Sequence, residues 1–429
     1  MLAGPNAWGV PPMSDYLRQA VEAQQAGRTE QAVHCLQCAS PEQASEAERN
    51  RALEAALQLL QAVEFQHQWA IAKVLPRFGT AVVAPAVALL EDERLDPETR
   101  WFAISVLGEF DDARAIRALA WVCQASEEAE LVEAAAQALV RLGRSAVTAL
   151  TALLQAESHR QLAVRSLAQL CHPASIEPLL GASEDADPAV RAMAIKALGQ
   201  FRDLRIPPVL TAALADASAT VRKQAVAGVA SCAARGELSD GTAWLQARLD
   251  DCDLAVSQAA ARELGRIGTD GAAQALTALL QSPAVPEPLQ ADAVRALGRI
   301  ATSPALEGLE AAWPQAPSAV CQTAARELAR FGGPLSQRAT RVALAWLETE
   351  AAGKAAIRQQ LALALGELDQ AQAFEPLLVL AADPVPAVRW HAIAALGKLP
   401  NAAQRVRQYA SDSPIHQQGR TNVLADWDG

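Results

Sequence analysis

A short pattern of apolar and small residues recurs along this chain. It consists of an apolar residue, usually Leu, then a Gly or Ala, a variable residue and a second apolar residue. We call the first residue of each copy the anchor. The clearest anchors are Leu107, Leu198, Leu264, Leu297, Leu365 and Leu396, and weaker copies have Leu75, Leu139, Leu167, Val229 and Leu328. Successive anchors are 28 to 37 residues apart, which is typical of a repeat architecture.

The residues before each anchor predict a helix. In the copy that ends at Leu198, Val190, Ala194 and Leu198 share one helix face. Asp187 followed by Pro is a favourable helix start, because the carboxylate caps free N–H groups and Pro suits the first turn. The small residue after the anchor permits close helix packing or helix termination. A second apolar helix follows, as at 374–378, so two helices make one repeat.

A single helical hairpin of this kind cannot bury both of its apolar faces. Neighbouring hairpins must therefore stack, which predicts an all-α fold: an α-solenoid with a concave and a convex surface, forming a curved right-handed superhelix. We expect the solenoid over 67–410, after a helical N-terminal cap at 13–66. The Pro/Gly-rich residues 1–12 are predicted to be disordered, with Met13 as a candidate translation start, and the polar residues 411–429 to form a flexible tail.

Composition and charge narrow the function. Aromatic residues make up only 4% of the chain, and long runs of Val, Ile and Thr are absent, which favours helix over sheet. The net charge of −11 argues against nucleic acid as a partner. No apolar stretch reaches the roughly 20 residues that span a bilayer, so we expect no membrane insertion. The N-terminus lacks the features of a secretory signal, and seven irregularly spaced cysteines do not form a disulfide framework, which together predict a cytoplasmic protein.

The repeat itself resembles a known family. The segment Asp-x-x-Val-Arg-x-x-Ala-x-x-Ala-Leu-Gly, followed by Ile-x-Pro-Leu, is similar to the HEAT-like repeat named after the phycobilisome lyases of cyanobacteria. The best copies are 187–210, 383–397 and 96–119. The resemblance implies a helical scaffold that presents a client protein.

Proteins with this repeat differ in function. They include paired bilin lyase subunits, adaptors without enzymatic activity, and a partner of an iron–sulfur carrier. Our leading expectation is a non-catalytic protein-binding scaffold or assembly chaperone that holds its client on the concave face. The alternatives are a phycobilin lyase or isomerase subunit, acting on phycobiliproteins with a second lyase subunit, and a partner of an iron–sulfur cluster carrier. The chain is expected to have no cofactor of its own, and a bilin or a cluster would be supplied by the partner.

Aromatic residues recur at one position of the repeat. Trp69, Trp101 and Trp390 each precede an anchor by six residues, and Phe102 and His391 follow the last two. One explanation is packing between repeats. The other is contact with a partner, because aromatic side chains are enriched in interface hot spots. We therefore predict a partner-binding set of Trp69, Trp101, Phe102, Trp390 and His391.

Basic residues recur two positions after the anchor. Such a ladder could bind an acidic client or propionate groups. The favourable interaction of cations with helix C-termini explains it equally simply, and is the interpretation we prefer. The ladder consists of Arg77, Arg141, Arg266, Arg299, Arg330 and Lys398.

Acid and Arg also recur together near the start of the anchor helix. The pairs are Asp96/Arg100, Asp187/Arg191, Asp216/Arg222 and Asp383/Arg389. Because they are repeated, they do not indicate a single active centre. We predict that they form hydrogen bonds between repeats.

Two groups of thiols are candidates for metal or cofactor contact. Cys35 and Cys38 lie beside His34, and Cys171 precedes His172. A closed zinc site needs four ligands, and no second Cys pair completes one, so small buried side chains remain the simpler interpretation. The sequence also lacks a phosphate-binding Gly loop, a His-Glu-x-x-His motif and a nucleophile elbow, and therefore predicts no independent catalytic centre.

Overall fold

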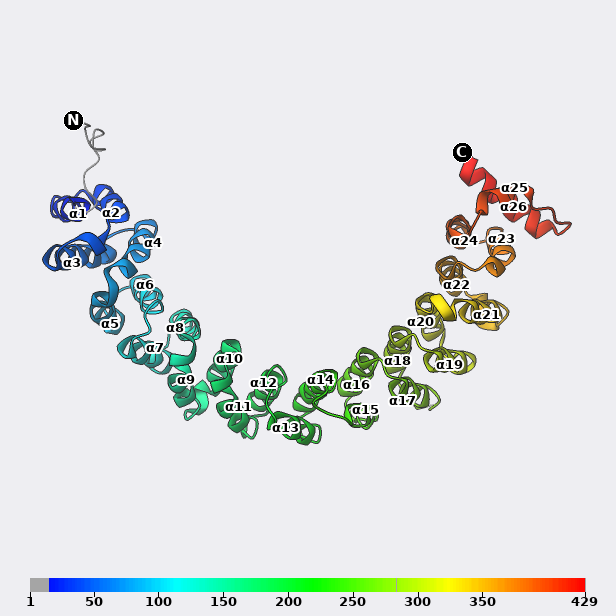
Figure 1. The fold of residues 1–429 in the computed structure, drawn as a ribbon, viewed down its shortest axis with the longest axis horizontal. Coiled ribbons are helices and arrows are strands. Elements are labelled where there is room, and N and C mark those ends of the chain that lie inside the picture. The colour runs from blue at the N-terminus through cyan, green and yellow to red at the C-terminus, as the bar shows by residue number, and fades with distance from the viewer. Residues whose placement is uncertain (1–14, 283, 429) are drawn as a thin grey trace, which may run out of the picture. The chain divides into compact units, whose positions relative to one another are not determined.

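The regular elements of the protein are helices throughout the part of the chain that is described (Figure 1). The computed structural model describes residues 15–282 and 284–428. The chain divides into two compact units, the first ending at Phe201 and the second beginning at Arg202. The all-α prediction is confirmed. The predicted disordered segment 1–12 and the candidate start Met13 lie outside the described residues.

The first unit contains twelve α-helices within the described residues. Their bounds are α1 Asp15–Gln25, α2 Thr29–Cys38, α3 Glu46–Ala62, α4 Phe65–Val74, α5 Val83–Glu91, α6 Pro97–Leu107, α7 Ala113–Ala125, α8 Ala129–Arg141, α9 Val147–Leu153, α10 Arg160–Leu170, α11 Ile176–Ala182 and α12 Pro188–Leu198.

The second unit continues the alternation of helices. Their bounds are α13 Ile206–Ala213, α14 Ala219–Ala234, α15 Gly241–Gln246, α16 Leu254–Ile267, α17 Asp270–Leu280, α18 Glu287–Ile300, α19 Ser303–Ala312, α20 Ser318–Glu327, α21 Ser336–Leu347, α22 Ala355–Leu368, α23 Phe374–Leu380, α24 Pro386–Lys398, α25 Ala402–Gln408 and α26 Pro414–Asp428.

Within each unit the helices form two layers, as Figure 1 shows. In the first unit α4, α6, α8, α10 and α12 pack on one another in sequence, and α5, α7 and α9 do the same on the other side. In the second unit α14, α16, α18, α20, α22 and α24 form the corresponding series. Below, the series that begins with α4 is called the even layer of the first unit, and the series that begins with α14 is called the even layer of the second unit.

The anchors explain why the layers hold together. All eleven lie in the last two turns of an even-layer helix or just after it, and none is more than 1% exposed. Full burial of a Leu side chain contributes roughly 1.5–3 kcal/mol, so the repeated anchors supply a large part of the apolar core. The pattern read from the sequence therefore marks the residues that join the layers.

The small residue after the anchor serves close packing between successive helices. A Cβ atom on Gly265 would lie 2.7 Å from the Ala296 Cβ and 2.8 Å from its Cα. The same contact recurs between Gly366 and Ala395, again at 2.7 and 2.8 Å. In both cases the facing Ala immediately precedes the next anchor, so each repeat leaves room for the following one.

The predicted hydrogen bonds between repeats form at some of the recurrent arginines, whereas Arg191 and Arg389 donate to backbone carbonyls of their own repeat. Arg222 donates to both carboxylate oxygens of Asp251, from Nε at 2.8 Å and Nη2 at 2.7 Å. Arg358 donates in the same way to Asp383, at 2.6 and 3.1 Å. Both of these arginines thus bind the acid of the next repeat, and Arg222 also donates to the Asp216 carbonyl oxygen of its own repeat at 2.9 Å. Burial alone would raise the pKa of Asp251 and Asp383, but the hydrogen bonds from these arginines and from backbone N–H groups outweigh it and hold the pKa of both carboxyls below the usual range.

Two tryptophans stack inside the second unit. The rings of Trp313 and Trp346 have centroids 3.9 Å apart and planes within 6° of parallel, and each side chain is 4% exposed. Trp313 Nε1 donates to the Thr349 hydroxyl at 3.1 Å, so its polar atom is satisfied in the core. This pair links the end of α19 to α21.

The described part of the predicted flexible tail, residues 411–428, is largely helical. Residues 414–428 form α26, which packs on α23. Val423 is fully buried and the Asn422 side chain donates to the Ala381 carbonyl at 2.8 Å. The helix α26 is mostly polar and has only one narrow apolar face, which its composition does not reveal.

The segment Phe65–Glu91 is long and apolar enough to cross a membrane by length and composition, contrary to our reading of the sequence. Its backbone leaves helical geometry at Gly79, with φ 70° and ψ −156°, which separates α4 from α5. These helices have 10 and 9 residues, about half of what a bilayer requires. They instead bury Ile71, Val74 and Leu90 in the core of the first unit.

Candidate functional site

Trp69 and Trp101 lie side by side on the even layer of the first unit. Trp69 comes from α4 and Trp101 from α6, and their rings stack with centroids 6.2 Å apart and planes 18° from parallel. Trp69 is 44% exposed. Lys73 lies over the Trp69 ring at 5.0 Å from the centroid. The register seen in the sequence therefore brings two of the three tryptophans together.

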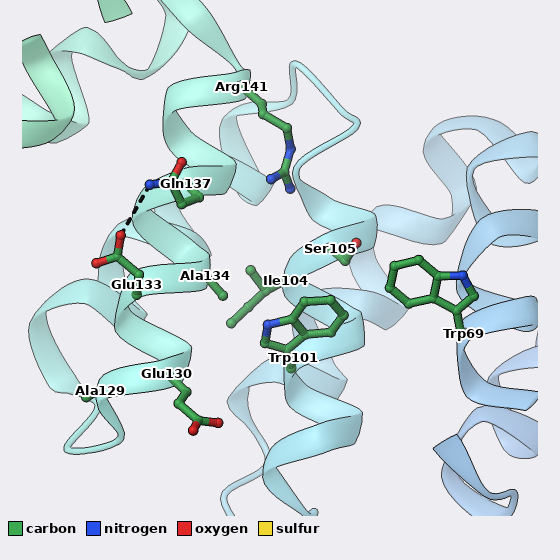
Figure 2. A pocket seen from close by; sticks show the side chains of 10 residues that line it. All are labelled: Trp69, Trp101, Ile104, Ser105, Ala129, Glu130, Glu133, Ala134, Gln137 and Arg141. Atoms are coloured by element: carbon green, nitrogen blue, oxygen red, sulfur yellow. Dashed lines mark hydrogen bonds between the residues drawn. The ribbon is translucent and has the colours of Figure 1, made fainter. Parts of the chain in front are cut away.

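A groove of about 850 Å³ lies beside this pair (Figure 2). On one side it is formed by α4 and α6 and on the other by α8, all within the first unit. We call it the tryptophan groove. Its lining residues are Trp69, Trp101, Ile104, Ser105, Ala129, Glu130, Glu133, Ala134, Gln137 and Arg141.

The groove exists because the aromatic register ends at α8. Trp69 and Trp101 stand six residues before their anchors, and the residue six before Leu139 is Glu133. Glu133 forms an ion pair with Arg165 and accepts a hydrogen bond from Gln137 at 3.2 Å. Since these contacts hold Glu133 and the neighbouring Ala134 is small, no side chain fills the space next to Trp101.

The two ends of the groove carry opposite charges. Figure 2 shows Arg141 at one end of the lining and Glu130 at the other. The Arg141 guanidinium lies over Gly108, where an added Cβ would meet Nη2 at 2.5 Å. Neither Arg141 nor Glu130 has an ion-pair partner among residues 15–282 and 284–428. Both groups are therefore available to a bound molecule.

Phe102 is not a contact residue, and its assignment to the partner-binding set is corrected. Its side chain is fully buried. The ring packs edge-on against Trp101 at 5.2 Å and Trp69 at 6.3 Å between centroids. Phe102 thus supports both tryptophans from the core.

A smaller recess of about 250 Å³ lies on the other side of Trp101. Phe65, at the first position of α4, is 53% exposed and forms one of its walls. We call it the Phe65–Trp101 recess. It is lined by Phe65, Pro97, Glu98, Trp101, Glu130 and Leu131.

The aromatic register six residues before the anchor does not include Phe65, Glu98 or Glu130, so the sequence pattern did not predict them. Phe65 precedes its anchor Leu75 by ten residues, as Pro97 and Ala129 precede theirs. The position ten residues before these anchors therefore marks the helix starts of successive repeats. Comparing the repeats at that position would have indicated that these helix starts lie together at the recess.

Trp390 and His391 belong to the second unit, on α24. Trp390 is 66% exposed and has no aromatic contact within the described part of the chain. His391 is half-buried, with Nδ1 2.6 Å from the Ala387 carbonyl oxygen and Nε2 3.3 Å from the Gln359 side-chain nitrogen. Each stays a predicted contact, separate from the tryptophan groove.

Three of the six residues of the predicted basic ladder are neutralised by ion pairs. Arg266 and Arg330 each donate from Nε to a Glu three residues earlier, Glu263 and Glu327, both at 2.6 Å. Lys398 forms an ion pair with Glu367, and Arg77 donates to the Gln37 carbonyl oxygen at 3.2 Å. Arg299 is exposed. Of the ladder, only Arg141 lines a groove described here.

The candidate metal ligands do not assemble into a site. Cys35 is buried, and burial raises the pKa of its thiol, whereas Cys38 Sγ lies 3.8 Å from His34 Nε2. Cys171 is exposed at a left-handed turn, φ 47°, and His172 accepts a hydrogen bond from the Ala174 N–H at 3.1 Å. Over the described residues no group of three or more His, Cys, Asp or Glu side chains could hold a metal ion.

The repeats define the family. The model for HEAT repeats matches residues 53–140, 88–160, 147–231, 206–291, 242–330 and 341–417, which together make up most of the chain. The protein belongs to the HEAT-repeat family. Comparison with curated proteins gives no match.

Solved structures and models share the fold at low sequence identity. A homology model of the full-length AP-3 complex in an intermediate open conformation has a TM-score of 0.53 and 10% identity, covering 96% of this chain and 89% of that chain. A structure of Kap95p with RanGDP has a TM-score of 0.48 and 14% identity, covering 96% of this chain and 62% of that chain. Yeast importin-beta gives 0.44 and 14%, covering 95% and 63%. This chain thus spans less than two thirds of either importin chain, and only the match to the AP-3 model, at a TM-score of 0.53, bears on the fold.

Proposed function

We propose that this protein is a scaffold that holds a client protein, with the tryptophan groove as a main point of contact. HEAT-repeat solenoids are typical protein-binding scaffolds. The observation that carries the proposal is the stacked pair Trp69 and Trp101 at the edge of a groove of about 850 Å³. Large aromatic side chains that stay exposed beside a groove are the usual anchors of an interface.

Packing between repeats explains only part of this arrangement. The stack joins α4 to α6, but the fully buried Phe102 already fills the space beneath both rings. Trp69 keeps 44% of its surface exposed, which a purely structural tryptophan would bury. The exposed ring faces are therefore available for a partner.

The test is quantitative affinity purification from the native organism with three forms of the protein. We expect Trp69→Ala with Trp101→Ala to reduce capture of the client by about 30-fold, since a pair of hot-spot residues contributes 2 kcal/mol or more. Trp121→Ala is the matched control, because Trp121 is 36% exposed on α7, in the other layer of the same unit. If all three forms captured the same proteins equally, the tryptophan groove would not be the client site.

The role of a phycobilin lyase subunit is a second proposal and rests on the repeat resemblance. Such a subunit would act with a second subunit on a Cys of its phycobiliprotein client. Co-expression with bilin-synthesis enzymes and candidate antenna subunits, followed by absorbance of the purified subunits, tests it. Absence of a bilin adduct on every subunit would contradict it.

An iron–sulfur trafficking role is a third proposal, supported by the exposed thiols of Cys171 and Cys252 together with the family analogy. Anaerobic purification followed by iron determination tests it. If neither the protein nor a co-purified partner contained iron, this role would be excluded.

A further inference from the structure

The Phe65–Trp101 recess combines aromatic walls with unpaired acids. Phe65 and Trp101 come from α4 and α6, and the carboxylates of Glu98 and Glu130 lie on α6 and α8. Trp101 and Glu130 also line the tryptophan groove, so the two hollows share a wall. A molecule bound in the groove would reach the recess around the edge of Trp101.

The charges around the recess are not compensated by ion pairs from the described residues. Glu98 and Glu130 are exposed and form no ion pair with any described residue. The nearby Arg100 is buried, with its guanidinium donating to Glu128 at 3.3 Å, so it does not neutralise them. Acids are favoured in the first turn of a helix, but the start of α6 already has Asp96 as its cap, accepting from the Thr99 N–H at 2.8 Å.

This chemistry fits the end of a basic side chain. A guanidinium or ammonium group is attracted to the face of an aromatic ring and forms strong hydrogen bonds with carboxylates, while its aliphatic stem packs on apolar surface. The volume of about 250 Å³ is small for a drug-sized ligand. Lys73 over Trp69 shows the same pairing of a cation with the adjacent ring.

We propose that the Phe65–Trp101 recess binds a Lys or Arg side chain of the client, on an apolar segment that lies in the tryptophan groove. This inference rests on the proposed scaffold function and specifies the chemistry of its partner. Arg141 lies at the opposite end of the groove from Glu130 and does not line the recess. The recess is therefore acidic. The segment therefore places its basic residue on the side of Glu98 and Glu130.

Three fluorescein-labelled ten-residue peptides test the proposal by fluorescence anisotropy at physiological salt. They alternate Leu with Arg, with Gln or with Glu. The full chain is compared with Glu98→Gln/Glu130→Gln and with the charge-matched control Glu91→Gln/Glu93→Gln, whose exposed residues lie at the end of α5 and just after it. Circular dichroism confirms that each variant is folded.

We expect the Leu/Arg peptide to bind at least tenfold more tightly than the Leu/Gln peptide. The Glu98→Gln/Glu130→Gln variant should lose at least fivefold of this preference and the control less than twofold. Equal loss in the variant and the control, or equal binding of the Leu/Glu and Leu/Arg peptides, would overturn the proposal.

The design separates this inference from the scaffold function. If all three peptides bound equally, and binding were lost in Trp69→Ala/Trp101→Ala, the groove would remain a client site and only the basic-residue specificity would be wrong. If sedimentation showed a wild-type dimer that became a monomer in Glu98→Gln/Glu130→Gln, a second copy of the chain would fill the recess, and a separate client would be excluded there.

Discussion

At the scale of single residues, the glycine after the anchor has a steric role. Gly265 and Gly366 have right-handed helical neighbours and lie within their helices, so a left-handed conformation does not explain them. Their lack of a Cβ lets the next helix approach, with the facing Ala less than 3 Å from where that atom would stand. At these two positions the glycine in the repeat signature is therefore explained by close contact between helices and not by the end of a helix.

Replacing Gly366 by Ala should destabilise the second unit by about 1–3 kcal/mol, because the new methyl group overlaps Ala395. Urea unfolding followed by circular dichroism measures the effect. The control is Gly181→Ala on α11, where no atom lies within 4 Å of the added Cβ. There the reduced flexibility of the unfolded chain should raise stability by about 0.5–1 kcal/mol. The same sign for both substitutions would contradict the steric explanation.

At the scale of elements, the ion pairs between repeats are expected to matter because they are buried. The side chains of Arg222 and Asp251 are 10% and 3% exposed. Arg222→Gln leaves the Asp251 carboxylate with only the more distant Arg248, at 3.8 Å, and should lower the free energy of unfolding by up to about 3–5 kcal/mol. Arg205→Gln is the control, since Arg205 pairs with Asp203 of its own turn and is 52% exposed; it should change stability by less than about 1 kcal/mol.

The same pairs predict a dependence on pH. The pKa of Asp251 and Asp383 is lowered in the folded state, so their contribution to stability is present above the unfolded value of about 3.9 and is lost as the pH falls below it. We expect the urea midpoint to decrease from about pH 4 downward. The decrease should be shallower in Arg222→Gln, in which Asp251 no longer has this stabilising donor. Identical slopes in both proteins would argue against the assignment.

The last helix, α26, should depend on its single apolar face. Val423→Asp buries a charge without a partner, which costs several kcal/mol and should detach α26 from α23. Hydrogen exchange of amides 414–428 is expected to accelerate by more than 100-fold. The exposed Thr421→Asp is the control and should leave exchange within a few-fold of wild type.

The sequence predicted some elements well and others poorly, for physical reasons. The anchors identified the even layer because burial and close packing impose the same residues on every copy. The helix α26 was missed because only Val423 and Gly419 are buried along its 15 residues, too few to create a pattern. The pairing of Trp69 with Trp101 followed from their shared register, but the groove depends on how Glu133 is held by Arg165, which spacing alone does not reveal.

At the scale of the whole molecule, stability should be distributed locally. In a repeat protein each hairpin contacts mainly its neighbours, so a perturbation propagates over few repeats. Gly366→Ala should increase hydrogen exchange around α22 and α24 while amides 15–201 keep their wild-type protection. Uniform acceleration along the entire chain would instead indicate one cooperative transition.

The stacked tryptophans make such local behaviour visible without labels. Indole rings as close as those of Trp313 and Trp346 couple their electronic transitions, which produces a circular dichroism signal that vanishes when the rings separate. Trp69 and Trp101 form a second, looser pair in the other unit. Each unit therefore contains its own optical reporter, and the order in which the two signals disappear during heating would tell which unit opens first.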